Sequence, residues 1–192
     1  MAITSLKSGI STRSGMAGNT FIYPGSYESI ASTNGSVGGA TFTSIPQTYT
    51  HLQLRIITKS IGAGTDYYNY RFNADATSGN YRTHSLVGNG TSASAGTNPT
   101  GNTSAFIPHT IPGTNATNVF SGIIIDILDY TNTNKYTTIR SLGGYDANGS
   151  GEAVLASGVW LSTSAVTSLA IGGYNTDLSY TGNASYSLYG IA

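Results

Sequence analysis

Apolar and polar residues alternate most clearly over residues 51–59. One set of alternate positions holds Leu52, Leu54 and Ile56, and the other holds His51, Gln53 and Arg55. Because successive side chains of a strand point to opposite faces of its sheet, the pattern predicts a strand with one buried face. Pro46 has no N–H to donate to a ladder, so we place it in the turn before this strand.

Shorter segments of the same kind recur along the chain, separated by clusters of Gly, Asn, Ser and Pro. The expected strands are residues 27–32, 40–45, 48–59, 67–73, 81–87, 105–108, 119–130, 135–142, 152–161, 166–173 and 185–191. About ten to eleven strands with no amphipathic helix predict an all-β, antiparallel β-sandwich, and the strand number favours a jelly roll. We expect loops over residues 143–151 and 88–104, the second long enough to be functional.

The first 25 residues differ from the rest, because neither alternation nor a helical pattern is sustained there. We interpret residues 1–25 as an extended N-terminal arm and residues 26–192 as the sandwich domain. The alternative is a frayed terminus. The arm has no acidic residue, and its apolar side chains need a surface on which to be buried. The candidate interface residues are Ile3, Leu6, Lys7, Ile10, Arg13 and Met16 in the arm, with His51, Gln53 and Arg55 on the polar face of the central strand.

Composition narrows the classes of partner. Charged residues make up 8% of the chain, against roughly 25% in an ordinary soluble domain. A surface of Ser, Thr, Asn, Gly and Tyr with so little charge indicates a protein that works inside an assembly. Zero formal charge argues against nucleic acid as a partner, and the absence of cysteine excludes disulfides and thiolate zinc sites. No apolar run is long enough for a secretory signal or a membrane span, so we expect no membrane partner.

Several segments together resemble a known group of proteins. They are Tyr27-Glu-Ser-Ile-Ala, Ile45-Pro-Gln-Thr-Tyr-Thr-His-Leu-Gln-Leu-Arg55, Arg71-Phe-Asn-x-Asp75 with Asn80-Tyr81, His84-Ser-Leu-Val-Gly-Asn-Gly90 and Ser187-Leu-Tyr-Gly-Ile191. With Ser5-Leu-Lys-Ser-Gly9 and Arg13-Ser14, this set resembles small virion structural proteins of tailed bacteriophages, especially phages of aquatic bacteria, including cyanophages. The resemblance spans nearly the whole chain, and its motifs are structural rather than catalytic.

The resemblance implies a non-enzymatic role in the virion. It implies a capsid decoration or cement protein that binds other virion proteins, above all the major capsid protein, and that associates with itself, for which we expect a homotrimer. The alternative is a tail fibre or receptor-binding appendage that recognises host polysaccharide. No catalytic residue and no cofactor follow from the resemblance.

Candidate chemistry in the chain is sparse. His51, His84 and His109 are far apart in the sequence and have no metal-ligand spacing. The best cation candidate is Asp146, Asn148 and Glu152, where oxygen ligands alternate in a glycine-rich segment, as calcium prefers. The same residues are also those from which turns are made.

The tyrosines leave a carbohydrate site open. Candidate glycan contacts are Tyr67, Tyr68, Tyr70, Tyr81 and Tyr145, with Asn and Asp nearby for sugar hydroxyls. The competing interpretation is that alternating tyrosines pack within and along sheets, where aromatic residues are favoured.

Overall fold

The computed structural model of the chain describes residues 27–34, 38–63, 66–97, 104–115, 117–173 and 183–192. These residues form twelve strands and no helix. The first six strands are β1 (Tyr27–Thr33), β2 (Ala40–Phe42), β3 (His51–Thr58), β4 (Asp66–Phe72), β5 (Tyr81–Gly88) and β6 (Ala93–Thr97). The others are β7 (Ala105–Thr110), β8 (Ser121–Leu128), β9 (Thr137–Asp146), β10 (Gly151–Trp160), β11 (Leu169–Gly173) and β12 (Ser185–Ile191). The predicted arm lies outside the described residues.

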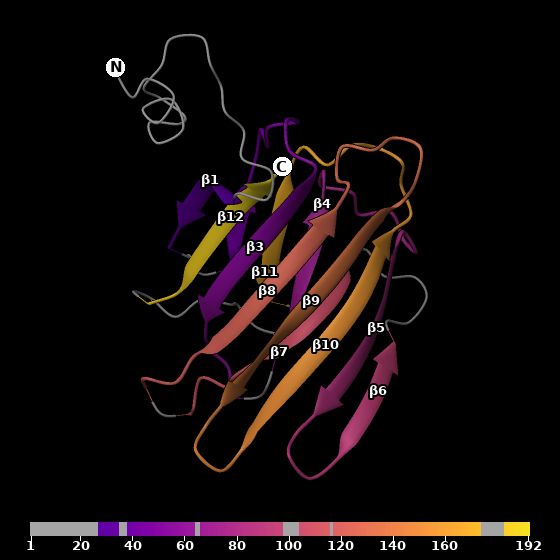
Figure 1. Cartoon of the computed structure of the whole chain (residues 1–192). Helices are drawn as coiled ribbons and strands as arrows, with labels where there is room; N and C mark the ends of the chain where they lie inside the picture. The colour runs from indigo at the N-terminus through magenta and orange to yellow at the C-terminus, as the bar shows by residue number, and fades with distance from the viewer. Residues whose placement is uncertain (1–26, 35–37, 64–65, 98–103, 116, 174–182) are drawn as a thin grey trace, which may run out of the picture.

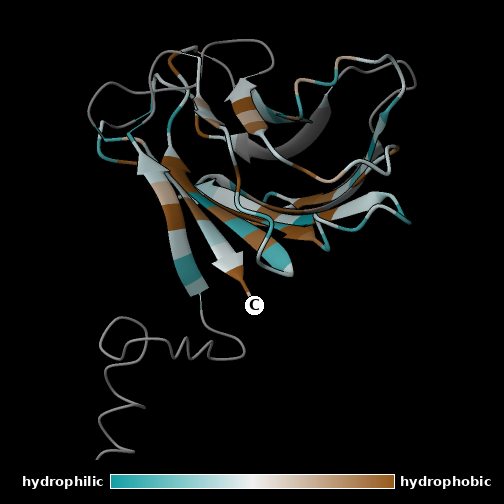
Figure 2. Ribbon diagram, turned by 90° about the horizontal axis from the view of Figure 1, so that it is seen from above, coloured by the Kyte–Doolittle hydropathy of each residue, from teal (hydrophilic) through white to brown (hydrophobic). Residues whose placement is uncertain are grey.

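The strands form two antiparallel sheets packed face to face. An eight-stranded sheet has the order β1-β12-β3-β8-β9-β10-β5-β6, and a four-stranded sheet has the order β2-β11-β4-β7. Figure 1 shows the larger sheet in front and β11, β4 and β7 behind it. Seen from above, the two layers lie one over the other, with apolar and polar bands alternating along the strands (Figure 2). The predicted antiparallel β-sandwich is therefore confirmed.

Four of the strand pairs are nested in sequence, which means that each pair encloses the next pair along the chain. The first strand pairs with the last, β2 with β11, β3 with β8, and β4 with β7. The remaining strands form two hairpins, β5–β6 and β9–β10, and both extend the larger sheet beyond β8.

The core lies between the sheets and is built by alternation. On β3, Leu52, Leu54 and Ile56 are almost fully buried, as the sequence predicts. On β8 the inward residues are Ile123, Ile125 and Ile127, which lie opposite those of β3 in register. Aromatic side chains from both sheets and further aliphatic residues complete the core.

Two predicted loops are wrong in part. Residues 143–146 and Gly151 belong to the strands of the β9–β10 hairpin, so its turn is reduced to residues 147–150. Asn148 and Gly149 both have positive φ, at 58° and 105°, as the twist of a tight hairpin requires. The segment 88–104 contains β6 after a turn in which the Asn89 side chain accepts hydrogen bonds from the backbone N–H groups of Thr91 and Ser92.

Candidate binding surface

The face of the eight-stranded sheet that points away from the four-stranded sheet, here called the outer face, carries most of the exposed apolar side chains. Among the residues that the structure describes, nine large apolar side chains are exposed, and six of them lie on this face, while Ile61, Tyr67 and Tyr136 lie elsewhere. The six are Tyr27, Ile57, Leu86, Ile124, Leu142 and Leu155. Such a gathering on one side marks a surface for another molecule.

Four of these residues form a continuous line, here called the apolar row. Ile124 lies opposite Leu142, Leu142 opposite Leu155, and Leu155 opposite Leu86. Their exposed fractions are 42%, 57%, 49% and 53% in the order Ile124, Leu142, Leu155, Leu86. Directly opposed side chains on neighbouring strands are in contact distance, so the row crosses β8, β9, β10 and β5 without a break.

A flat shelf of small residues runs beside the apolar row. On each of the four strands, the residue two positions from the row residue is small. These residues are Gly122, Gly144, Ala153 and Gly88, and the strand register places them side by side. Because these residues have little or no side chain, another molecule can approach the sheet closely there while it contacts the row. The row therefore protrudes from the outer face, and the shelf lies lower beside it.

A polar and aromatic network adjoins one end of the row, and we call it the Arg55 network. It comprises Tyr27, Gln53, Arg55, Asp126, Arg140 and Tyr189. The Arg55 guanidinium lies 5.1 Å from the ring centroid of Tyr27 and 5.0 Å from that of Tyr189. Both distances are within the range of cation–π attraction.

Hydrogen bonds fix the other members of the Arg55 network. Arg55 Nε donates to Gln53 Oε1 at 2.8 Å, and Gln53 Nε2 donates to Asp126 Oδ1 at 2.8 Å. Arg140 Nη2 donates to Asp126 Oδ2 at 2.9 Å. Gln53 is only 7% exposed, although it points to the outer face, because its neighbours cover it. The network presents preorganised donors and aromatic faces, but it offers no nucleophile with an adjacent base.

His51 has a structural contact. Its Nδ1 accepts a hydrogen bond from the backbone N–H of Asp129 at 2.9 Å. The same nitrogen lies 3.3 Å from Asp129 Oδ1. The Asp129 carboxylate also binds Lys135 Nζ, and this bond holds the pKa of Asp129 below its usual range.

The histidines do not converge. His51 lies on β3 and His84 on β5, four strand positions apart in the larger sheet, which corresponds to about 19 Å. Within the described part of the chain, no three His, Cys, Asp or Glu side chains gather where a metal ion would bind. Helices long and apolar enough to cross a membrane are likewise not found in the described ranges.

Three of the five candidate glycan tyrosines are wrong. Tyr68, Tyr70 and Tyr81 are at most 1% exposed and belong to the core between the sheets, so a surface ligand does not reach them. Burial raises the pKa of Tyr81 to about 12, and its hydroxyl donates to the carbonyl of Asp75 at 3.1 Å. Tyr67 is 41% exposed and Tyr145 is partly exposed.

The calcium candidates lie on the β9–β10 hairpin. Asp146 Oδ1 accepts the backbone N–H of Asn148 at 2.8 Å, which is a local turn contact. Asp146 and Glu152 also line a shallow polar hollow of about 400 Å³, together with Tyr145 and Asn89. Asn148 does not line it. The turn explains the spacing of these residues without a cation.

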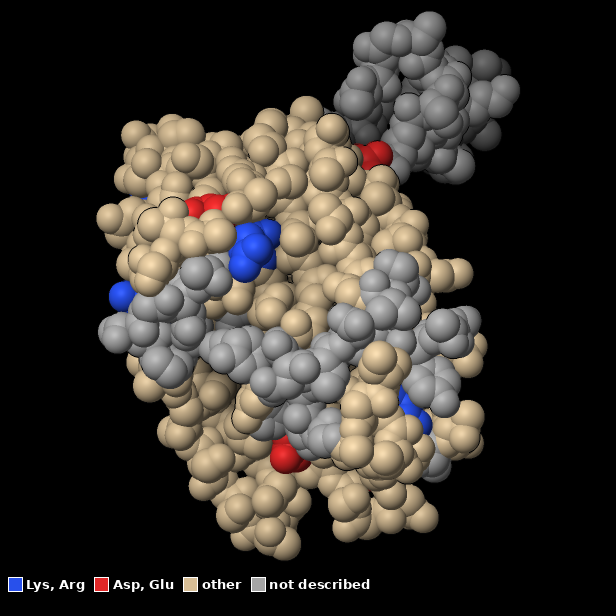
Figure 3. All heavy atoms as spheres, turned by 180° about the vertical axis from the view of Figure 1, so that it is seen from behind, with Lys and Arg blue, Asp and Glu red and all other residues tan. Residues whose placement is uncertain are grey.

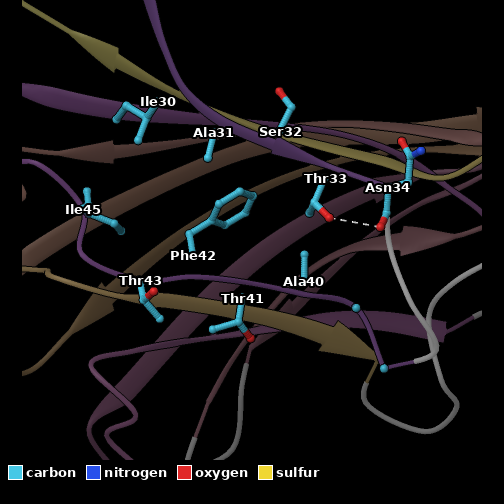
Figure 4. A pocket seen from close by; sticks show the side chains of 12 residues that line it. Ile30, Ala31, Ser32, Thr33, Asn34, Ala40, Thr41, Phe42, Thr43 and Ile45 are labelled. Carbon is cyan, nitrogen blue, oxygen red and sulfur yellow. Dashed lines mark hydrogen bonds between the residues drawn. The ribbon is translucent and has the colours of Figure 1, made fainter.

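A second hollow, of about 680 Å³, opens between β1 and β2, where the edges of the two sheets diverge. Figure 4 shows the Phe42 side chain pointing toward the strand that carries Ile30 and Ala31. Its described lining residues include no ionisable side chain, so they supply neither an acid nor a base.

The rear of the molecule shows the low charge of the chain. In Figure 3, few Lys, Arg, Asp or Glu atoms interrupt the neutral surface seen from behind. By contrast, the Arg55 network brings two arginines and one aspartate together on the outer face.

Sequence reasoning identified Gln53 and Arg55 but missed their partners and the apolar row. A usable signal was present in Ser121–Leu128, where Ile124 interrupts the alternation between Ile123 and Ile125. A strand that is apolar on both faces is typical of a sheet that is covered on both faces. Tyr27, Asp126 and Tyr189 join Arg55 only through the strand order, which could not be read from the sequence.

Comparisons with protein-family models, with curated proteins and with solved structures give no match for this chain. The resemblance to phage virion proteins therefore stays a prediction.

Proposed function

We propose that this chain is a non-enzymatic structural protein of a phage virion that decorates and stabilises the shell. The observation that carries the proposal is the apolar row with its shelf of small residues on an outer face that no described residue covers. Such a surface binds another protein, and the major capsid protein is the partner that we propose. Protein interfaces of this kind have an apolar centre and a polar rim with arginine and tyrosine, which the Arg55 network would supply.

We further propose that the sandwich is a jelly roll, the fold expected from the strand number. The nested pairs β1–β12, β2–β11, β3–β8 and β4–β7 support it, because a jelly roll is a long antiparallel ribbon folded over on itself. The N-terminal arm, residues 1–25, would add a second attachment to the shell.

Shell binding tests this function directly. Shells assembled from the major capsid protein are mixed with the wild-type chain, with Leu142→Glu, with Leu155→Glu and with Ile61→Glu, and bound protein is measured by co-sedimentation. Ile61 is 50% exposed but lies outside the outer face, so it controls for the loss of an exposed apolar side chain. We expect at least a tenfold loss of affinity for the two row variants and none for Ile61→Glu, because a buried unpaired charge disfavours association.

Full binding of both row variants would refute the outer face as the attachment surface. Deletion of residues 1–25 tests the arm separately, and full loading of the truncated chain would refute its role. Virion localisation is tested by the copy number per particle, since hundreds of copies indicate the shell and a few to tens indicate the tail.

The second candidate is a tail appendage that binds host polysaccharide. The hollow at the β9–β10 hairpin favours it, because Tyr145 lies there beside Asn89, Asp146 and Glu152, which are the side chains that bind sugar hydroxyls. Glycan arrays distinguish the candidates: binding that Tyr145→Ala abolishes supports the appendage, and no binding at high protein concentration rejects it.

A further inference from the structure

Arg55 lies at one end of the apolar row. It lies opposite Ile124 in the register of β3 and β8, so it continues the line of the row by one strand. Both side chains are exposed on the outer face. Neighbouring strands are about 4.8 Å apart, so a molecule that covers Ile124 also reaches the side chain of Arg55.

The Arg55 guanidinium is held in place, but part of it is unused. Its Nε donates to Gln53 Oε1 at 2.8 Å, and the rings of Tyr27 and Tyr189 lie within cation–π distance. Among the residues that the structure describes, none accepts a hydrogen bond from Nη1 or Nη2 of Arg55. The N–H groups on these two nitrogens are therefore available to a further ligand.

The nearest carboxylate in the Arg55 network is already used. Asp126 Oδ1 accepts from Gln53 Nε2, and Asp126 Oδ2 accepts from Arg140 Nη2. Asp126 thus neutralises Arg140, and no described carboxylate forms an ion pair with Arg55. With two arginines and one aspartate, this end of the outer face attracts negative charge.

We propose that Arg55 binds a carboxylate of the partner protein, from an aspartate or glutamate that adjoins the apolar side chains covering the row. A guanidinium that leaves water with unpaired N–H groups disfavours association, so an interface over Ile124 needs an acceptor at Arg55. A carboxylate accepts two parallel N–H groups of the guanidinium and cancels its charge. The inference rests on the proposed function and adds the chemistry of the segment that the outer face binds.

A phosphate group also fits a guanidinium, but the surroundings of Arg55 disfavour a nucleic acid. Nucleic acids bind to clusters of unpaired cations. Here one unpaired arginine is connected through Gln53 to the ion pair of Asp126 and Arg140. The adjoining apolar row suits a protein segment, because protein interfaces combine an apolar centre with a polar rim.

Variants with equal charge test the contact in the shell-binding assay. Arg55→Gln and Lys135→Gln each remove one positive charge, but Lys135 lies between β8 and β9 and is paired with Asp129. We expect Arg55→Gln to lower the affinity for shells at least about tenfold and Lys135→Gln to stay within about twofold of wild type. Trp160 fluorescence checks that both variants are folded.

Salt separates an ion pair with the shell from a structural role within the chain. Added salt should weaken shell binding of the wild type more than that of Arg55→Gln, because only the wild type forms the intermolecular ion pair. If Arg55 only positioned Gln53, the variant would bind more weakly but with the same salt dependence as the wild type.

Carbodiimide cross-linking identifies the group that Arg55 contacts. The reagent activates a carboxyl group, and a neighbouring lysine amine then forms an amide with it while the urea leaves. We expect Arg55→Lys, at saturating concentration, to be linked at position 55 to an aspartate or glutamate of the shell protein, as mapped by mass spectrometry. Ile61→Lys, an exposed position outside the outer face, should give no such linkage at position 61.

Two results would overturn the inference alone. One is wild-type shell binding by Arg55→Gln when Leu142→Glu has lost binding. The other is bound Arg55→Lys without a linkage to a shell carboxyl group at position 55. Full binding of Leu142→Glu and Leu155→Glu would instead refute the outer face as the attachment surface, so the two failures are distinguishable.

Discussion

Asp75 connects its own loop with the end of β10, 85 residues further along the chain. Its carboxylate accepts hydrogen bonds from Trp160 Nε1 at 2.7 Å, from Asn80 Nδ2 at 2.9 Å and from the backbone N–H of Thr77 at 2.9 Å. Partial desolvation alone would raise the pKa of Asp75. The hydrogen bonds from Asn80, Thr77 and Trp160 outweigh it and hold this pKa below its usual range.

We expect Asp75→Asn to lower the free energy of unfolding by about 1–2 kcal/mol at pH 7, because an amide oxygen is a weaker acceptor than a carboxylate. A folded-state pKa below the ordinary value of about 4 means that the carboxylate stabilises the fold above that pH. Its contribution is lost as the pH falls toward the folded-state pKa. The difference between wild type and variant should therefore shrink below about pH 4.

Urea titrations at pH 7 and pH 3 measure this difference, and the single tryptophan, Trp160, reports unfolding by its fluorescence. A gap that stays the same at both pH values would contradict the assigned role of the carboxylate. Ala76→Ser, an exposed change in the same loop, should leave both titrations within about 0.5 kcal/mol of wild type.

At the scale of elements, two adjacent glycines set the path from β1 to β2. Gly38 and Gly39 have φ values of 101° and 104°, which L side chains rarely adopt. A Cβ at Gly39 would lie 2.0 Å from the carbonyl oxygen of Ile171, whereas a Cβ at Gly38 would meet open space. The backbone of β11 thus packs directly on Gly39.

Gly38→Ala and Gly39→Ala therefore separate backbone strain from steric overlap. We expect Gly38→Ala to lower the free energy of unfolding by about 1–2 kcal/mol through strain alone. Gly39→Ala should cost at least about 2 kcal/mol more, because β11 must shift. Urea unfolding of both variants measures the difference, and equal losses would show that the approach of Gly39 to Ile171 is not what constrains this corner.

The alternation of apolar and polar residues predicted the strands that show this pattern. It did not predict strand segments made of small residues. β12 was predicted with its exact bounds, and the inward face of β3 was predicted correctly. β6 was missed because its five small residues show no alternation. The extension of β9 was missed because Gly143 resembles a loop residue, yet a Cβ there would lie 2.6 Å from Ile123 Cγ1. That glycine serves packing within the sheet.

The candidate surface was less predictable than the fold, because it is made by pairing between distant segments. Tyr27 reaches Arg55 only because the last strand, β12, pairs with both β1 and β3 and so holds these two strands in one sheet. Likewise, Leu86 joins Leu155 because one inserted hairpin pairs with the other. No local pattern carries this information.

For the whole molecule, the two inserted hairpins supply most of the proposed binding surface. Leu142 and Leu155 lie on β9–β10, and Leu86 lies on β5–β6, whereas the nested pairs contribute only Ile124 to the row. The nested pairs hold most of the core between the sheets, and the hairpins add Tyr81, Ile139 and Trp160 to it. Folding and binding are thus assigned to opposite faces of the larger sheet.

The neighbouring residues Ile124 and Ile125 test this separation on one strand. Ile125 is 2% exposed and packs in the core, while Ile124 is 42% exposed in the apolar row. We expect Ile125→Ala to lower the free energy of unfolding by about 3 kcal/mol, since it leaves a cavity. Ile124→Ala should cost less than about 1 kcal/mol, because little buried contact is lost.

Shell binding should show the reverse order. Ile124→Ala removes part of the surface that we propose to contact the partner, so its affinity should fall several-fold although the chain is fully folded. Ile125→Ala, measured at a temperature where it remains folded, should bind as the wild type does, because Ile125 faces the other side of the sheet. Equal losses of shell affinity in the two variants would mean that binding follows stability, and this result would refute the outer face as the binding surface.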